Sequence, residues 1–104
     1  MNMITFNNLN GQSVEILQLW LNREEADVSL QLTLLLNGEA VSLRCKNIHG
    51  LMMDELSYPM QIAGFEIVDN SDKGWEASQR YTVRDYEDGK IGFYCETIEV
   101  LQFI

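Results

Sequence analysis

The chain has 104 residues, of which 46% are hydrophobic and 22% are charged, and this composition is typical of one globular domain with a core. Acidic residues outnumber basic ones 16 to 7, and the net charge of −9 repels phosphate backbones and anionic lipid headgroups. Binding to nucleic acid or to a membrane surface is therefore disfavoured, whereas a basic protein partner, a cation or plain solubility is compatible with this charge.

The start of the sequence and its two cysteines bear on the cellular compartment. Met1–Phe6 lack the basic and apolar regions of a secretory signal peptide. Leu34–Leu36 is as long as any clean apolar run in the sequence, and three residues are far too few to cross a bilayer. We therefore expect a cytoplasmic protein in which Cys45 and Cys95 are reduced thiols in the core, although two cysteines leave a disulfide open.

The first quarter of the chain is expected to contain two strands. A short strand is predicted over Met3–Phe6, and it ends in the turn-rich segment Asn7–Gly11. The segment Ser13–Leu21 fits either an amphipathic helix or a strand that is buried on both sides. We favour the strand, because the polar segment Asn22–Asp27 then forms a connection into the next element.

The clearest element is a β-hairpin over Val28–Asn47. Asn37-Gly38 supplies two residues that tolerate a positive φ, as a two-residue type I′ turn requires. Closing the turn there gives one nearly apolar face with the pairs Leu36–Glu39, Leu34–Val41, Leu32–Leu43 and Leu30–Cys45. The other face receives the pairs Thr33–Ser42, Gln31–Arg44 and Ser29–Lys46, which suit water. A slip of one residue would exchange the two faces, so this pattern specifies the register.

The middle of the chain is less regular. Ile48–Ser57 is expected to form a loop or a single helical turn packed on the sheet edge, and Tyr58-Pro59 disfavours a helix. Met60–Asp69 is predicted to be a strand whose apolar positions change parity at Gly64. Such a change at a glycine indicates a β-bulge.

The C-terminal third is predicted to contain the polar loop Asn70–Gly74, a second hairpin and a final strand. In the hairpin Asp88-Gly89 forms the turn, which gives the pairs Glu87–Lys90, Tyr86–Ile91, Arg84–Phe93 and Thr82–Cys95. The apolar segment Thr97–Ile104 is expected to lie inside a sheet. These seven or eight short strands predict a mainly β fold, a single antiparallel β-sandwich or small barrel with one short helix at most, over residues 1–104.

The sequence contains no motif that indicates a catalytic, cofactor-binding or metal-binding site. His49 follows Cys45 by four residues, but a nucleophile pair needs hydrogen-bond contact and a third orienting group. The histidine and the two cysteines lack zinc-ligand spacing. Asp69–Gly74 resembles a calcium loop only in its glycine, because Lys73 and Arg80 occupy positions that require oxygen ligands. Carboxylates are abundant, but without a cleft they do not indicate acid–base catalysis.

One part of the sequence has the composition of a protein-contact surface. Aromatic and acidic residues are interspersed in the C-terminal half, where aromatic side chains would anchor a partner and carboxylates would steer a basic one. The candidate partner-binding residues are Trp75, Tyr81, Tyr94, Asp85, Glu87 and Asp88. Tyr86 and Phe93 are assigned to the core instead.

The segments Tyr58–Ile67 and Arg80–Glu96 resemble small uncharacterised single-domain proteins of Gram-positive bacteria. The resemblance covers about the last half of the chain. It implies a β-rich domain without an assigned activity, and no functional residue follows from it.

The sequence therefore predicts a non-enzymatic, acidic protein-binding domain, such as an immunity-type partner of a basic protein. The second hypothesis is a small-ligand or carbohydrate-binding β module that uses Trp75 and nearby tyrosines. A carboxylate-based enzyme is the third. No cofactor is expected, and the sequence leaves homo-oligomer formation open.

Overall fold

The structure is a computed structural model that describes residues 9–23, 25–53 and 60–102. Its strands are β1 (Gln12–Arg23), β2 (Val28–Leu36), β3 (Glu39–Lys46), β4 (His49–Met53), β5 (Met60–Asp69), β6 (Tyr81–Asp85), β7 (Ile91–Cys95) and β8 (Thr97–Gln102). They form one antiparallel sheet in the order β4-β7-β6-β5-β1-β2-β3-β8. Two 3₁₀ turns, η1 (Ser71–Lys73) and η2 (Ala77–Gln79), lie between β5 and β6. The predicted mainly β, antiparallel fold is therefore confirmed.

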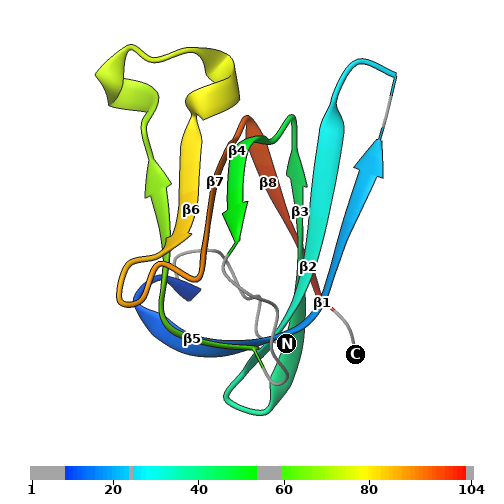
Figure 1. Cartoon of the computed structure of the whole chain (residues 1–104), viewed down its shortest axis with the longest axis vertical. Helices are drawn as coiled ribbons and strands as arrows, with labels where there is room; N and C mark the ends of the chain where they lie inside the picture. The colour runs from blue at the N-terminus through cyan, green and yellow to red at the C-terminus, as the bar shows by residue number, and fades with distance from the viewer. Residues whose placement is uncertain (1–8, 24, 54–59, 103–104) are drawn as a thin grey trace.

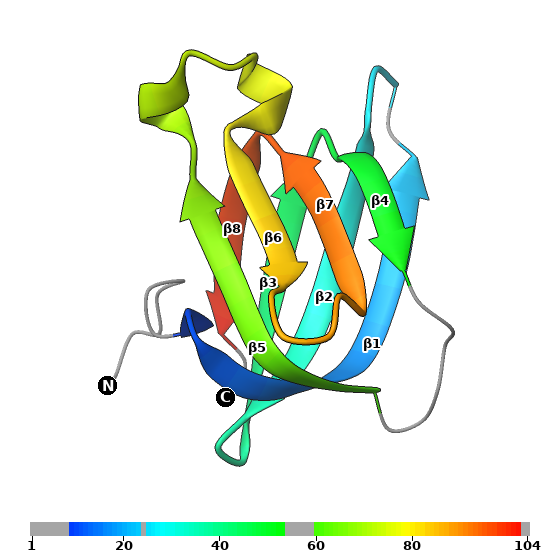
Figure 2. The same cartoon turned by 60° about the vertical axis from the view of Figure 1, so that its left-hand side comes forward.

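The sheet folds over on itself into two facing layers, and β1 and β5 curve through the bend between them (Figure 1, Figure 2). β6, β7 and β4 form one layer, and β2, β3 and β8 form the other. In the pairings of β1 with its two neighbours the register shifts in two places, next to Leu17 of β1 and at Ala63-Gly64 of β5. Because bulges bend a strand and increase its twist, they allow β1 and β5 to belong to both layers. The bulge predicted at Gly64 is confirmed, and the sheet stays open between its edge strands β4 and β8.

The hydrophobic core lies between the two layers. Its buried members are Leu9, Val14, Ile16, Leu30, Leu32, Leu34, Leu36, Val41, Leu43, Cys45, Met60, Ile62, Phe65, Ile67, Val83, Ile91, Phe93 and Cys95. Across the described residues, no helix has the length and apolar character needed to pass through a membrane.

The first hairpin has the predicted turn and register. Asn37 and Gly38 both adopt a positive φ, 50° and 83°, and every predicted pair from Leu30–Cys45 to Leu36–Glu39 is observed. The prediction for the opposite face is only partly correct, because Ser29 and Ser42 are buried there. Ser42 is a small residue that accepts a hydrogen bond from the side-chain amide of Gln31, 3.3 Å away.

Two predictions for the first half of the chain require correction. Ser13–Leu21 is a strand, as favoured, but it is not buried on both sides, since Leu17, Trp20 and Leu21 are exposed. β1 also continues through Arg23, which pairs with Val28, so that the connection is shorter than predicted.

The predicted loop or helical turn after the first hairpin is instead an edge strand. Within Ile48–Ser57, the residues of β4 pair with β7, while residues 54–57 lie outside the described part. The predictions for Met3–Phe6 and Tyr58-Pro59 lie outside it as well. Gly50, Asp54 and Glu55 interrupt the apolar residues of this segment, so the sequence did not indicate a strand, and β4 forms through its pairing with the distant β7.

The second hairpin is shifted by one residue from its predicted register. Tyr81 pairs with Cys95, Thr82 with Tyr94 and Val83 with Phe93, and residues 86–90 form a longer turn. Consequently Tyr86 points outward and is exposed, which contradicts its assignment to the core, whereas Phe93 is buried as predicted.

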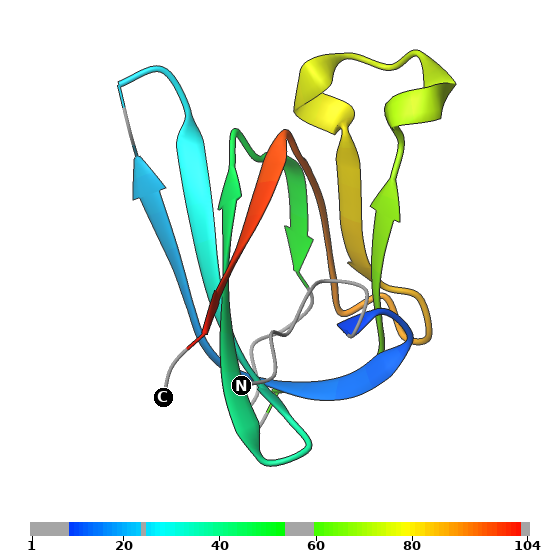
Figure 3. The same ribbon diagram turned by 180° about the vertical axis from the view of Figure 1, so that it is seen from behind.

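The final strand is also placed differently from its prediction. β8 lies at an edge of the sheet rather than inside it, paired with β3, while residues 103–104 lie outside the described part. The β3–β4 and β7–β8 connections both pass from one layer to the other, they lie side by side (Figure 1, Figure 3), and two hydrogen bonds join them. The backbone N–H of Glu96 donates to the Lys46 carbonyl (3.0 Å), and the side-chain amide of Asn47 donates to Glu96 Oε1 (3.0 Å).

Candidate functional site

The structure separates the six predicted partner-binding residues into two groups. Trp75, Tyr81 and Tyr94 lie at the end of the β6–β7 hairpin that carries the 70–80 loop. Asp85, Glu87 and Asp88 lie at the opposite end, where β6 turns into β7 (Figure 2). The aromatic and acidic residues therefore do not form one continuous surface.

Asp85 has a structural environment. Its side chain is only 4% exposed, and its carboxylate accepts backbone N–H groups from Glu87 (3.2 Å) and Lys90 (3.2 Å). A buried carboxylate that caps a turn in this way satisfies backbone donors that would otherwise lack partners. Asp85 is thus not available as a contact for a partner, while Glu87 and Asp88 remain exposed.

The 70–80 loop is held in place by the buried side chain of Asn70. Its amide nitrogen donates to the Gln79 carbonyl (3.1 Å) and to Thr82 Oγ1 (2.8 Å), and its oxygen accepts from Lys73 Nζ (3.0 Å). At the start of the loop, Asp69 Oδ1 accepts the backbone N–H of Ser71 (2.9 Å). The Ser71 backbone and side-chain hydrogen bonds, together with nearby Arg80, lower the pKa of Asp69. The loop is therefore ordered by specific contacts on both flanks.

This anchored loop presents an aromatic side chain beside a hollow. Trp75 is 49% exposed, and its ring meets that of Tyr94 edge-on, with centroids 6.4 Å apart and an interplanar angle of 81°. The hollow of about 360 Å³ next to Trp75 is also lined by Glu76, Arg80 and Glu96. We refer to Trp75, Tyr94, Glu76, Arg80 and Glu96 together as the aromatic loop site.

Basic side chains of the loop lie on its aromatic rings. Lys73 Nζ is 4.9 Å from the centroid of the Trp75 ring, and Arg80 Cζ is 5.4 Å from that of Tyr81. Such cation–π contacts stabilise the orientation of the rings, and they hold the charged groups of Lys73 and Arg80 against the rings. Tyr81 is half-buried at the base of the loop.

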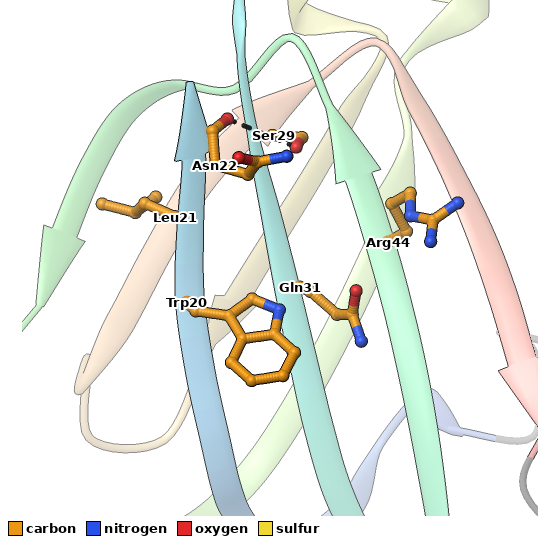
Figure 4. A pocket seen from close by; sticks show the side chains of 6 residues that line it. All are labelled: Trp20, Leu21, Asn22, Ser29, Gln31 and Arg44. Atoms are coloured by element: carbon orange, nitrogen blue, oxygen red, sulfur yellow. Dashed lines mark hydrogen bonds between the residues drawn. The ribbon is translucent and has the colours of Figure 1, made fainter. Parts of the chain in front are cut away.

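A second concave site lies on the outer face of β1, β2 and β3, and the sequence did not predict it. Trp20, Gln31 and Arg44 point to the same side of the sheet, whereas Leu21 points away (Figure 4). With Asn22 and Ser29 they line a hollow of about 420 Å³, which we call the outer-face pocket. Because Ser13–Leu21 was predicted to be a strand buried on both sides, Trp20 was not considered as an exposed side chain. The β1–β2 register, which includes a shift next to Leu17, places Trp20 opposite Gln31, and no signal in the sequence indicated that register.

The only histidine and the two cysteines do not form a catalytic group. His49 is exposed, and its Nε2 lies 2.9 Å from Asn47 Oδ1. Cys45 is buried and hydrogen-bonded to the thiol of Cys95, and this contact together with burial raises the pKa of Cys45. Both are free thiols. Among the described residues, no group of three or more histidine, cysteine or acidic side chains is placed to hold a metal ion.

Comparison of the chain with known protein families, with curated proteins and with solved structures finds no match.

Proposed function

We propose that this protein is a binding domain for a basic protein and that the aromatic loop site is its contact surface. The observation that carries the proposal is the half-exposed indole of Trp75, braced edge-on by Tyr94 beside a hollow. Tryptophan and tyrosine on a rigid support are the side chains most often found to dominate the energy of protein interfaces. A braced ring also loses little conformational entropy when a partner binds.

Charge supports a basic partner over a neutral or acidic one. The whole chain carries a net charge of −9, and among the described residues that line the hollow the two carboxylates of Glu76 and Glu96 outnumber the guanidinium of Arg80. A negative field of this kind accelerates the encounter with a positively charged protein. A protein that neutralises a basic toxin, as an immunity protein does, would bind such a partner.

We also propose that the protein is cytoplasmic. The buried, free state of both cysteines supports this location, because thiols stay reduced in the cytoplasm.

A comparative capture experiment tests the proposal. Immobilised wild-type protein and the variants Trp75→Ala and Trp20→Ala are incubated with an extract of the source cells, and retained proteins are identified by mass. Trp20 is a matched control because it is 53% exposed, close to the 49% of Trp75, yet lies on another face. We expect a basic protein that wild type and Trp20→Ala retain and that Trp75→Ala loses. Retention of the same proteins by all three baits would reject the aromatic loop site.

Binding kinetics with the captured partner separate the anchor from the charges. Trp75→Ala should mainly accelerate dissociation, since a lost aromatic anchor commonly costs about 2 kcal/mol or more. Glu76→Gln with Glu96→Gln should slow association and flatten its dependence on salt. The matched control is Glu87→Gln with Asp88→Asn, which removes the same charge at the far end of the hairpin. An association rate that responded more strongly to this control would assign the contact to the β6–β7 turn.

A further inference from the structure

The outer-face pocket is built on a row of side chains that crosses four neighbouring strands. Trp20 of β1 pairs with Gln31 of β2, Gln31 pairs with Arg44 of β3, and Arg44 pairs with Glu99 of β8. Because paired residues point to the same face of a sheet, the four side chains form one line on the outer face. With neighbouring strands roughly 4.8 Å apart, this line is about 14 Å long.

The chemistry along this row changes from apolar to polar over a short distance. The indole of Trp20 is 53% exposed, although large aromatic rings on strands are usually buried against other side chains. Beside it are the neutral side chains of Asn22 and Gln31 (Figure 4). The amide nitrogen of Gln31 donates to Ser42 Oγ. Among the described residues, nothing hydrogen-bonds to the side-chain oxygen of Gln31 or to the side chain of Asn22. These groups are available for a ligand.

The pocket is electrically balanced in spite of the acidic protein around it. Of the lining residues that the structure describes, Arg44 alone is charged, and Arg44 Nη1 lies 3.2 Å from Glu99 Oε1. The guanidinium keeps further N–H donors, but its charge is offset by the carboxylate. An anionic ligand would meet an arginine that is already ion-paired and a net charge of −9, and a cationic ligand would meet no carboxylate among the described lining residues. A neutral ligand fits best.

We propose that the outer-face pocket binds a neutral carbohydrate, with Trp20 stacked on the apolar face of a sugar ring and Gln31 and Arg44 hydrogen-bonded to its hydroxyl groups. A pyranose ring has an apolar C–H face and a polar rim, which is the same division that the pocket shows. The hollow of about 420 Å³ lies within the usual size range of small-ligand sites. The part of the row from Trp20 to Arg44 crosses three strands and is roughly 10 Å long, which exceeds one sugar ring, so the proposed ligand is an oligosaccharide rather than a single sugar. This site is separate from the aromatic loop site and uses the other tryptophan.

The two tryptophans allow a direct fluorescence test, since the chain contains no others. In the Trp75→Phe variant all indole emission comes from Trp20, and in Trp20→Phe it comes from Trp75. Each variant is titrated with cellotetraose, maltotetraose and chitotetraose at low and at high salt. We expect a saturable change for at least one sugar in Trp75→Phe, with an affinity that does not depend on salt. Trp20→Phe should show none.

A third variant tests the polar contacts. Gln31→Ala in the Trp75→Phe background should weaken binding of the same sugar roughly two- to tenfold, as expected for one neutral hydrogen bond, with an unchanged melting temperature. The absence of a saturable signal with all three sugars would overturn the proposal. An equal response in Trp20→Phe, or binding that weakens as salt rises, would overturn it too. None of these outcomes decides whether Trp75 contacts a basic protein, so the two proposals fail independently.

Discussion

The ring of Tyr86 lies directly against Gly64, where an added Cβ atom would come within 2.7 Å of Tyr86 Cζ. The backbone N–H of Tyr86 donates to the Gly64 carbonyl (2.9 Å), and the N–H of Gly64 is 3.4 Å from Asp85 Oδ1. The turn between β6 and β7 is thus attached to the bulge of β5. This attachment explains why a glycine is needed in the middle of a strand.

Replacing Gly64 by alanine should destabilise the protein by about 1–3 kcal/mol, because the new methyl group overlaps Tyr86 and Glu87 Cγ. The measurement is urea denaturation. In a background of Tyr86→Ala with Glu87→Ala the same change should cost clearly less, since the obstructing side chains are gone. An equal cost in both backgrounds would mean that the backbone at Gly64, rather than the packing of Tyr86, resists a side chain.

Asp85→Ala should lower the free energy of unfolding by at least about 1–3 kcal/mol, because it leaves backbone N–H groups of the turn without an acceptor. Asp88→Ala removes an exposed carboxylate three residues later and should cost less than about 0.5 kcal/mol. Chemical denaturation of the two variants under the same conditions makes the comparison. Equal stabilities would contradict the structural role of Asp85.

Leu32→Ala should destabilise the fold by about 2–5 kcal/mol, because Leu32 is fully buried between the layers. Thr33→Ala is the neighbouring control on the opposite face, where the side chain is only half-buried, and it should cost much less. Denaturant titration of both variants checks the register of the first hairpin. Similar losses would contradict it.

Native Cys45 and Cys95 should react slowly with a thiol reagent, because both are buried and Cys45 has a raised pKa. The rate of labelling is followed by mass, first in native buffer and then in denaturant, where both thiols should react rapidly. Fast labelling of either thiol in the native protein would instead indicate a reactive or redox-active cysteine.

Stability should fall in alkaline solution through Cys45. Its pKa is raised in the folded state, so above the unfolded-state value of about 8.5 the unfolded chain loses this proton first. The stabilising effect is complete below that pH and declines by about 1.4 kcal/mol per pH unit above it. Unfolding free energies are measured from pH 7 to 10 for wild type and for Cys45→Ser with Cys95→Ser. The two profiles should diverge above pH 8.5, and parallel profiles would contradict the shift.

Local pattern alone determines the first hairpin and the β5 bulge. Asn37-Gly38 supplies the backbone conformations of the turn, and the alternation of leucines allows a single register, so nothing outside the hairpin is needed to define it. Gly64 likewise marks its bulge by the parity of its neighbours. The mainly β, antiparallel character of the fold follows from the same short-range signals, whereas the strand β4 does not.

Contacts between distant segments decide the rest. The second hairpin does not close at Asp88-Gly89 in the predicted register, because Asp85 accepts N–H groups of the turn and also contacts Gly64 of β5. β4 and β8 are edge strands because of which neighbours they find, and their own residues do not encode this position. Both candidate sites depend on the same kind of information. Trp75 is placed by Asn70 and Tyr94, and Trp20 faces outward because the bulge next to Leu17 sets its register against Gln31. Side-chain periodicity describes one strand at a time, whereas a site that spans several strands exists only once the sheet has assembled.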